Sequence, residues 1–221
     1  MRDGLAYALF LPPGRPLGGV VVLHGAGSRK ESHYDYARCC RARGLAAIAV
    51  DQRGHGDSEG DLDERAASDV AVMATLLRER GAPRIGLRGS SMGGYLALVA
   101  AAAAGADAVV AICPASAAGL RRGLATGRLG FRAGRPALDA FLAANDAMAA
   151  ARALGVPLLL LHADGDEQVP VEHSRELHAA ADASRLVVVP GGHHRSIQHD
   201  AELQDLSVRF LLRALTGGGP Q

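Results

Sequence analysis

The sequence predicts an α/β fold in which helices cover both faces of a mostly parallel sheet. Apolar segments alternate with segments of helical periodicity along nearly the whole chain. The apolar segments are continuous rather than alternating, which is typical of strands buried on both faces. With 221 residues, the chain is long enough to form one domain with a sizeable core. We therefore expect a single domain over residues 1–215 and a disordered tail over 216–221.

The predicted elements follow in a regular order, which begins with a short edge strand that Pro12-Pro13 ends. The predicted strands cover residues 5–11, 19–24, 45–50, 107–113, 157–162 and 185–189. A strand, a tight turn and a helix together fill residues 84–104. The other predicted helices cover residues 34–43, 66–80 and 170–181, and a last helix, which includes His199, ends near residue 215. Residues 114–155 have no strand pattern and interrupt the alternation.

Charge and cysteine content narrow the function classes. The net charge of +1 argues against a general nucleic-acid binder, which would carry a basic excess. Cys39, Cys40 and Cys113 have no metal-type spacing, and we expect three reduced thiols. No signal peptide and no apolar run of about 18 residues is present, so no membrane partner is expected. These features predict a cytoplasmic protein, either a monomer or a homodimer.

The segment Gly89-Ser90-Ser91-Met92-Gly93 fits the pattern Gly-x-Ser-x-Gly. In such a turn the serine lies at the tip of a tight bend from a strand into a helix, and its neighbours must be small. The N-terminal N–H groups of the helix point toward the same place and stabilise negative charge there. The pattern predicts a nucleophilic Ser91, although a pentapeptide with two free positions also occurs in ordinary loops.

A nucleophilic serine needs a base and an acid that orients the base. The loop after strand 157–162 contains Asp164 and Asp166, and we favour Asp166 as the acid because Asp164-Gly165 fits a turn. The loop after strand 185–189 contains His193 and His194, and we favour His194 as the base. In a parallel sheet these loops meet Ser91 at the carboxyl edge.

An acyl-transfer site also needs backbone donors for the oxyanion. The N–H of Met92 directly follows the predicted nucleophile. The second donor is expected in the loop after His24-Gly25, where small residues let the backbone approach closely; we favour Ala26, with Gly27 as the alternative.

Taken together, the chain resembles the α/β-hydrolase superfamily, in a compact form similar to dienelactone hydrolases and small esterases. The resemblance rests on five segments in the family's order: 23–27, 51–58, 89–94, 164–170 and 191–194. It implies that Asp166, three residues before Val169-Pro170, is the acid and that His194 is the base. It also implies that loop 51–58 is structural, with its arginine and aspartate bracing the sheet edge, and that residues 115–155 form a cap over the pocket.

The cap region contains basic and apolar residues in separate groups. Its arginines are Arg121, Arg122, Arg128, Arg132 and Arg135. They fit either a solvated basic surface or a cluster at the pocket mouth that selects an anionic substrate. Its larger apolar residues are expected on the underside and are Leu138, Phe141, Leu142, Met148 and Leu154.

The sequence thus predicts a serine hydrolase of small carboxylic esters or thioesters that needs no cofactor and no metal. An acyltransferase or a peptidase with the same triad is one alternative. A non-catalytic ligand-binding member of the fold is the other.

Overall fold

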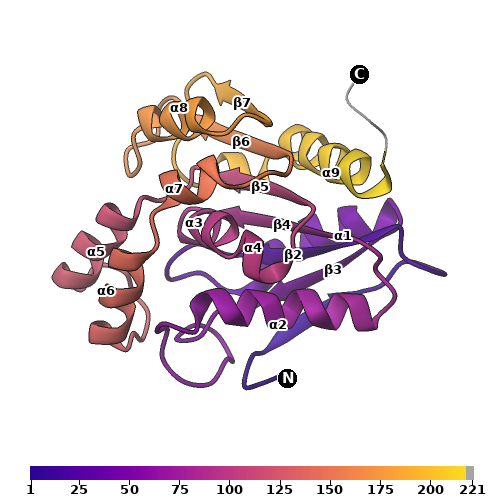
Figure 1. Cartoon of the computed structure of the whole chain (residues 1–221), viewed down its shortest axis with the longest axis horizontal. Coiled ribbons are helices and arrows are strands. Elements are labelled where there is room, and N and C mark those ends of the chain that lie inside the picture. Colours follow the sequence, from indigo (N-terminus) through magenta and orange to yellow (C-terminus); the bar gives the residue numbers. More distant parts are fainter. Residues whose placement is uncertain (218–221) are drawn as a thin grey trace.

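The computed structural model describes residues 1–217 and contains a seven-stranded sheet in the order β1-β3-β2-β4-β5-β6-β7 (Figure 1). Strand β1 pairs antiparallel with β3, and the other neighbouring strands pair in parallel. This confirms the predicted fold class. The strands are β1 (Tyr7–Phe10), β2 (Gly18–Leu23), β3 (Leu45–Val50), β4 (Ile85–Ser90), β5 (Ala108–Ile112), β6 (Leu158–Ala163) and β7 (Ser184–Val189).

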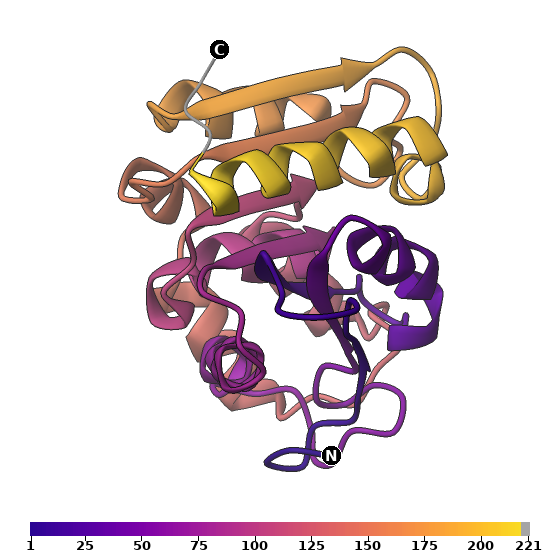
Figure 2. The same cartoon turned by 90° about the vertical axis from the view of Figure 1, so that its right-hand side faces the viewer.

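Helices cover both faces of the sheet, because β2 to β6 are completely buried and need apolar partners on each side. One face is covered by α1 (Tyr34–Ala42) and α9 (Ala201–Thr216), which lie toward the viewer in Figure 2. The helices packed on the other face are α2 (Ala66–Glu79), α3 (Met92–Val99) and α8 (Val171–Ala180). Within residues 1–217, no helix combines the length and apolar character that crossing a membrane requires.

The predicted cap region folds as three helices, which are α5 (Ala117–Thr126), α6 (Arg135–Ala144) and α7 (Ala147–Arg152). Helices α5 and α6 pack on each other at one end of the molecule, and α7 packs on α3 and α8 (Figure 1). Ser116 begins α5 by accepting a hydrogen bond from the N–H of Gly119, and Asp146 begins α7 in the same manner with Met148.

Three boundaries differ from the sequence-based expectations. The helix predicted to run to residue 104 is interrupted at Ala100, where α4 (Ala101–Ala104) starts. His199 lies in a short 3₁₀ turn, η2 (Ile197–His199), before α9 and not inside the last helix, because Asp200 begins α9 as its N-cap. Thr216, predicted in the tail, is the last residue of α9, and Gly217 ends the helix in the left-handed conformation. The rest of the predicted tail, 218–221, lies outside the described residues.

Parallel pairing places the ends of six strands at one edge of the sheet. Each strand from β2 to β7 leads at that edge into a loop that the sequence analysis singled out or into the cap. At the opposite end of β4, the packing of α9 needs a small residue, since a Cβ atom on Gly86 would lie 2.8 Å from a methyl group of Leu211. The site is therefore built on a rigid sheet whose strand ends are closely spaced.

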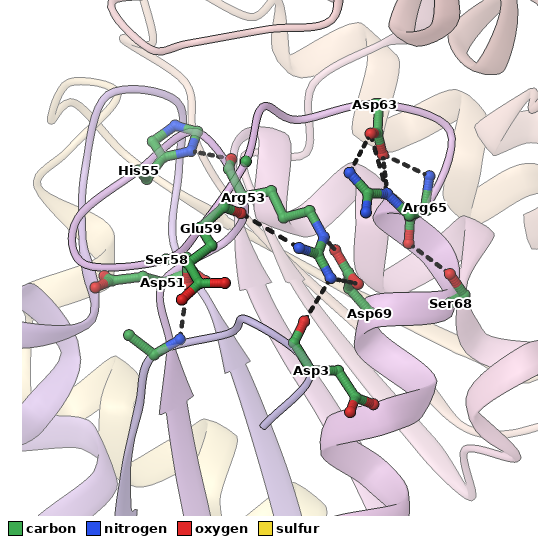
Figure 3. Close-up of polar contacts among 12 residues, drawn as sticks. Asp3, Asp51, Arg53, His55, Ser58, Glu59, Asp63, Arg65, Ser68 and Asp69 are labelled. Atoms are coloured by element: carbon green, nitrogen blue, oxygen red, sulfur yellow. Dashed lines mark hydrogen bonds and ion pairs between the residues drawn. The ribbon is translucent and has the colours of Figure 1, made fainter. Parts of the chain in front are cut away.

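The loop after β3 is braced by a largely buried ion pair, as Figure 3 shows. Arg53 forms two hydrogen bonds with the carboxylate of Asp69 on α2, at 2.8 and 3.1 Å. The same guanidinium donates to the carbonyl groups of Asp3 and Glu59. Because its five N–H groups are planar and fixed, arginine can join these separate segments at once. Asp51 at the start of this loop has a different partner, Lys30, which is buried with it.

We expect Arg53→Met to lower the free energy of unfolding by about 3–5 kcal/mol, because it leaves the carboxylate of Asp69 buried without its partner. Urea denaturation checks this value. The double variant Arg53→Met/Asp69→Leu is the matched control, and it should recover most of the loss because no charge is then left unpaired. A double variant no more stable than Arg53→Met would contradict this account.

Candidate active site

Ser91 lies in a strained turn between β4 and α3. Its backbone angles are φ 53° and ψ −119°, in the left-handed region that residues with a side chain rarely adopt. Gly89 and Gly93 permit the turn, because a Cβ atom on Gly89 would overlap the carbonyl of Gly93 and one on Gly93 would overlap the carbonyl of Leu23. The backbone segments packed on either side of the turn hold this strained conformation. The half-buried Ser91 thereby stays at the carboxyl edge of the sheet.

Backbone hydrogen bonds fix the turn to its surroundings. The N–H of Ser91 donates to the carbonyl of Ile112 at 2.8 Å, and the carbonyl of Ser91 accepts from Tyr95 and Ala115. These bonds join the turn to the end of β5 and to the start of the cap. The position of Ser91 is thus set by backbone groups, which, unlike side chains, have no alternative rotamers.

His194 and Asp166 form a close hydrogen-bonded pair at the same edge. The distance from His194 Nδ1 to Asp166 Oδ2 is 2.7 Å, and both side chains are almost completely buried. An ionised carboxylate only accepts, so Nδ1 carries the hydrogen and Nε2 is left with its lone pair. This is the tautomer in which the imidazole can take a proton from a serine hydroxyl.

The carboxylate of Asp166 accepts several further hydrogen bonds. The N–H groups of Gln168 and Val169 donate to Oδ1 at 2.8 and 2.9 Å, and His162 Nε2 lies 3.4 Å from Oδ2. Burial alone raises the pKa of Asp166, but the bonds from His162, His194 and the two N–H groups outweigh it and hold this pKa well below its ordinary value. The carboxyl group of Asp166 is therefore ionised at neutral pH and can accept the hydrogen bond from His194 Nδ1.

The two alternatives from the sequence analysis lie elsewhere. Asp164 accepts a hydrogen bond from the N–H of Gly191 and so joins the loop after β6 to the loop after β7. His193 is exposed, and its N–H and carbonyl bond to Ser196 within the turn. Among the described residues, no hydrogen bond is recorded between the side chains of Asp164 and His193 or from either of them to the His194–Asp166 pair.

The loop after β2 lies close to Ser91, and two of its N–H groups, those of Gly25 and Ala26, have no recorded acceptor among residues 1–217. The N–H of Gly27 donates to His55 Nε2 at 3.1 Å, so it is already used. Among residues 1–217, no acceptor is recorded for the N–H groups of Ala26 and Met92. A Cβ atom on Gly25 would lie 3.3 Å from that of Ser91, which shows how closely this loop approaches the serine. Of the two predicted donors in this loop, the N–H of Gly27 is therefore engaged, and no acceptor is recorded for that of Ala26.

Buried polar residues hold this loop in place. His55 Nδ1 donates to the carbonyl of Arg53, which leaves Nε2 as the acceptor for Gly27, and the ring stacks on Phe131 of the cap at 4.4 Å. His24 Nδ1 donates to the carbonyl of Gly25, and its Nε2 accepts from the N–H of Gln52. The Lys30 ammonium binds Asp51 at 2.7 Å where the loop ends.

The cap presents its basic and apolar residues to different surroundings. The arginines Arg121, Arg122, Arg128, Arg132 and Arg135 are all exposed. Arg121 pairs with Asp139 at 2.7 Å, and Arg132 donates to the carbonyl of Gly60. Beneath the cap lies a small apolar cavity, whose lining includes Met92, Tyr95, Leu120, Leu138, Phe141 and Leu142. The other two residues predicted for the underside, Met148 and Leu154, are partly buried against the core.

Comparison with known proteins decides the family. A family model described as "Alpha/beta hydrolase family" matches residues 20–154, more than half of the 221-residue chain. The chain belongs to the alpha/beta hydrolase family. A second model, described as "TAP-like protein", matches residues 142–217.

The chain is also similar to individual proteins. The chain is 25% identical over 216 residues to the uncharacterized protein YfhR of Escherichia coli O157:H7, with 92% of this chain and 73% of YfhR covered. Among solved structures it is similar to Est1E from Butyrivibrio proteoclasticus (TM-score 0.76, 20% identity, 96% of this chain and 94% of that chain). It is also similar to the monoacylglycerol lipase of Paleococcus ferrophilus (TM-score 0.73, 21% identity, 97% and 99%). These structural likenesses show the shared hydrolase fold.

One cluster near the acid has the composition of a metal site. Cys113, His162 and Asp166 offer ligand atoms within 4.8 Å of one another. However, both ring nitrogens of His162 are engaged, one by Ser174 and one by the carbonyl of Val169. Burial raises the pKa of the Cys113 thiol to about 12, so this position favours the uncharged thiol. With both nitrogens of His162 engaged, the cluster has no free imidazole ligand to offer a metal.

The roles of His24 and His162 in holding the site were not predicted from the sequence, and for His55 only a structural loop was expected. A signal for His24 and His162 was available, since each is a polar residue at the end of an apolar strand pattern. The role of His55 depends on the approach of the loop after β2, which no local pattern describes.

We expect the free energy of unfolding to fall as the pH is lowered from 6.5 toward 4. Burial, followed by the charge of a neighbouring residue, lowers the pKa of His24 to about 4 and that of His33 to about 2. The unfolded chain takes up these protons at the ordinary value near 6.5 and so binds more of them than the folded chain. Each histidine then removes about 1.4 kcal/mol per pH unit, which urea denaturation at a series of pH values measures.

The variants His33→Gln and His178→Gln separate this effect from general acid denaturation. His33→Gln removes one buried titrating group and should make the pH slope shallower. His178 is exposed on α8, and its replacement should leave the slope unchanged. Equal slopes for wild type and His33→Gln would show that the buried imidazole takes up a proton as readily as an unfolded one.

Proposed function

We propose that this alpha/beta hydrolase is a serine hydrolase that cleaves small carboxylic esters or thioesters through an acyl-enzyme. The observation that carries the proposal is the 2.7 Å bond between His194 Nδ1 and Asp166 Oδ2, at the same edge of the sheet as the strained Ser91. A nucleophile in a strained turn, a base in the correct tautomer and an ionised acid are the three groups that this chemistry needs.

In the proposed mechanism, Ser91 Oγ attacks the carbonyl carbon of the ester while His194 Nε2 takes its proton. Asp166 keeps the imidazole oriented and stabilises the imidazolium. The tetrahedral intermediate collapses, His194 gives the proton to the leaving alcohol or thiol, and the acyl group remains on Ser91. Water then attacks this acyl-enzyme with His194 as the base, which releases the acid and restores the serine.

The negative oxygen of each tetrahedral intermediate needs donors that are already in place. The N–H groups of Ala26 and Met92 are proposed for this role, since neither has a recorded acceptor among the described residues. Each such donor typically contributes about 3 kcal/mol of transition-state stabilisation. His55, which holds the neighbouring Gly27, supports this geometry without contacting the substrate.

The apolar surroundings next to Ser91 support an apolar acyl group as the substrate moiety. The cavity beneath the cap has an apolar lining and includes the side chain of Met92, the neighbour of Ser91. The cap arginines are exposed, and Arg121 has Asp139 as its partner, so an anionic acyl group would not meet them in this cavity. Est1E, one of the similar structures, has been solved with ferulic acid bound, which is consistent with an ester substrate here.

A fluorophosphonate probe tests the nucleophile without knowledge of the natural substrate. Wild-type protein is expected to be labelled covalently at Ser91, as intact-mass and peptide mass spectrometry would show. Ser91→Ala should not be labelled, while its free energy of unfolding stays close to that of wild type because the change is small. Equal labelling of wild type and Ser91→Ala would refute the proposal.

Separate replacement of the two adjacent histidines tests the base. His194→Ala should lower kcat for a nitrophenyl ester by about 10³-fold or more, because general-base catalysis is lost together with the proton donor for the leaving group. His193→Ala is the matched control and should stay near the wild-type rate, since His193 is exposed. If His193→Ala alone abolished turnover, the assignment of the base would be wrong.

A further inference from the structure

Arg88 is a buried cation in the middle of the nucleophile strand. It lies on β4, three residues before Ser91, and is completely inaccessible to solvent. Among the described residues, no carboxylate lies within ion-pair distance of its guanidinium. A buried charge without a counter-ion is unfavourable unless other polar groups compensate it. The groups that do so here indicate what the residue is for.

The guanidinium contacts two segments that lie far from β4 in the sequence. Its Nη1 lies 2.9 Å from His33 Nδ1, and its Nη2 donates to the carbonyl of Gln198 at 3.1 Å. Its central carbon lies 4.5 Å from the centre of the Tyr36 ring, on whose face the cation is stabilised. Since arginine has no acceptor, His33 Nδ1 accepts the first bond and the imidazole is neutral.

Each contacted segment carries a different part of the proposed catalytic site. Strand β4 leads directly into Ser91. His33 ends the 3₁₀ turn η1 (Lys30–His33), which follows the loop that contains Ala26. Gln198 lies in η2, four residues after His194. One side chain therefore links the nucleophile, the segment that follows the predicted oxyanion donor and the segment that follows the predicted base.

Additional contacts restrict the same junction. The rings of His33 and His199 are stacked with their centres 6.1 Å apart, which joins η1 to η2 directly. The carbonyl of Gln198 also accepts a bond from the side chain of Gln204 on α9, and Ile197 is buried in the core. The segment after His194 is thus held by the charged donor Arg88, by the neutral donor Gln204 and by the buried side chain of Ile197. Hydrogen bonds from a charged donor are roughly twice as strong as neutral ones.

We propose that Arg88 is a positioning residue that fixes the segments after Ala26 and after His194 relative to Ser91. The inference rests on the proposed function, because it concerns the distances among those same groups. Arg88 touches neither substrate nor reacting atoms. Its effect is on the geometry of attack, to which acyl-transfer rates are very sensitive: a displacement of about 1 Å can lower a rate about 10²-fold.

The test compares Arg88→Met and Arg88→Lys with Leu211→Ala. Arg88→Met keeps most of the volume and removes both hydrogen bonds, whereas Arg88→Lys keeps the charge. Leu211 is buried on α9 and packs on β4 at Gly86, so its replacement destabilises the same strand without touching the junction. The measurements are the rate of fluorophosphonate labelling at Ser91, kcat and KM for a nitrophenyl ester, the urea midpoint, and hydrogen exchange of residues 190–200.

For Arg88→Met we expect the labelling rate and kcat to fall by about tenfold or more, with KM nearly unchanged and faster hydrogen exchange in residues 190–200. Arg88→Lys should recover part of the rate. Leu211→Ala should show a lowered urea midpoint but wild-type labelling and wild-type exchange in that segment. If Arg88→Met is labelled as fast as Leu211→Ala, the proposed role of Arg88 is overturned.

Two further outcomes are decisive. If Arg88→Met does not fold, Arg88→Lys and His33→Phe take its place, since His33→Phe keeps a ring against His199 but removes the acceptor for Arg88. Wild-type labelling rates in both of these variants would overturn the proposal. A wild-type protein that is not labelled at all would instead refute the proposed serine hydrolase, and the role of Arg88 with it.

Discussion

The strained backbone at Ser91 is the constraint on which the rest of the site depends. A residue with a side chain keeps φ near 53° only if its surroundings hold it there, and here β2, β4, β5 and the start of α3 all do so. That arrangement requires glycine at positions 89 and 93, where a Cβ atom would overlap backbone. It also requires the parallel sheet, because only adjacent strand ends bring the loop after β2 and the end of β5 against the same turn.

Around this turn, buried polar side chains hold the loops in place through hydrogen bonds, as backbone hydrogen bonds hold the strands of the sheet. Lys30 and Asp51 hold the end of the loop after β2, and His55 holds Gly27 within it. His162 lies against Asp166, the proposed acid, and Arg88 reaches the segment that follows His194. Loops cannot be positioned by apolar burial alone, because their own N–H and C=O groups must be satisfied. His55 can accept the bond from the N–H of Gly27 only while its ring is neutral, which ties the position of the loop after β2 to pH.

Much of the fold was predictable, because strand and helix patterns are local. The continuous apolar runs gave the buried strands to within one or two residues, and the alternation gave a parallel sheet with helices on both faces. The incorrect predictions concern element boundaries, where the local preference of the residues competes with the capping and packing of the folded chain. Asp200 begins α9 and leaves His199 in a separate turn, and Thr216 belongs to α9 where the glycine-rich end suggested only a tail.

The sequence by itself determined the turn at Ser91 and the order of the loops, because both follow from residue types at fixed spacing. It also favoured Asp166 over Asp164 as the acid and His194 over His193 as the base. Only the tertiary structure shows which of each pair meets the other, since that choice depends on the register of β6 against β7. The partners of Arg88 likewise depend on contacts 55 and 110 residues apart. Spacing along a chain is local information, whereas the orientation of a buried side chain is set by every segment packed around it.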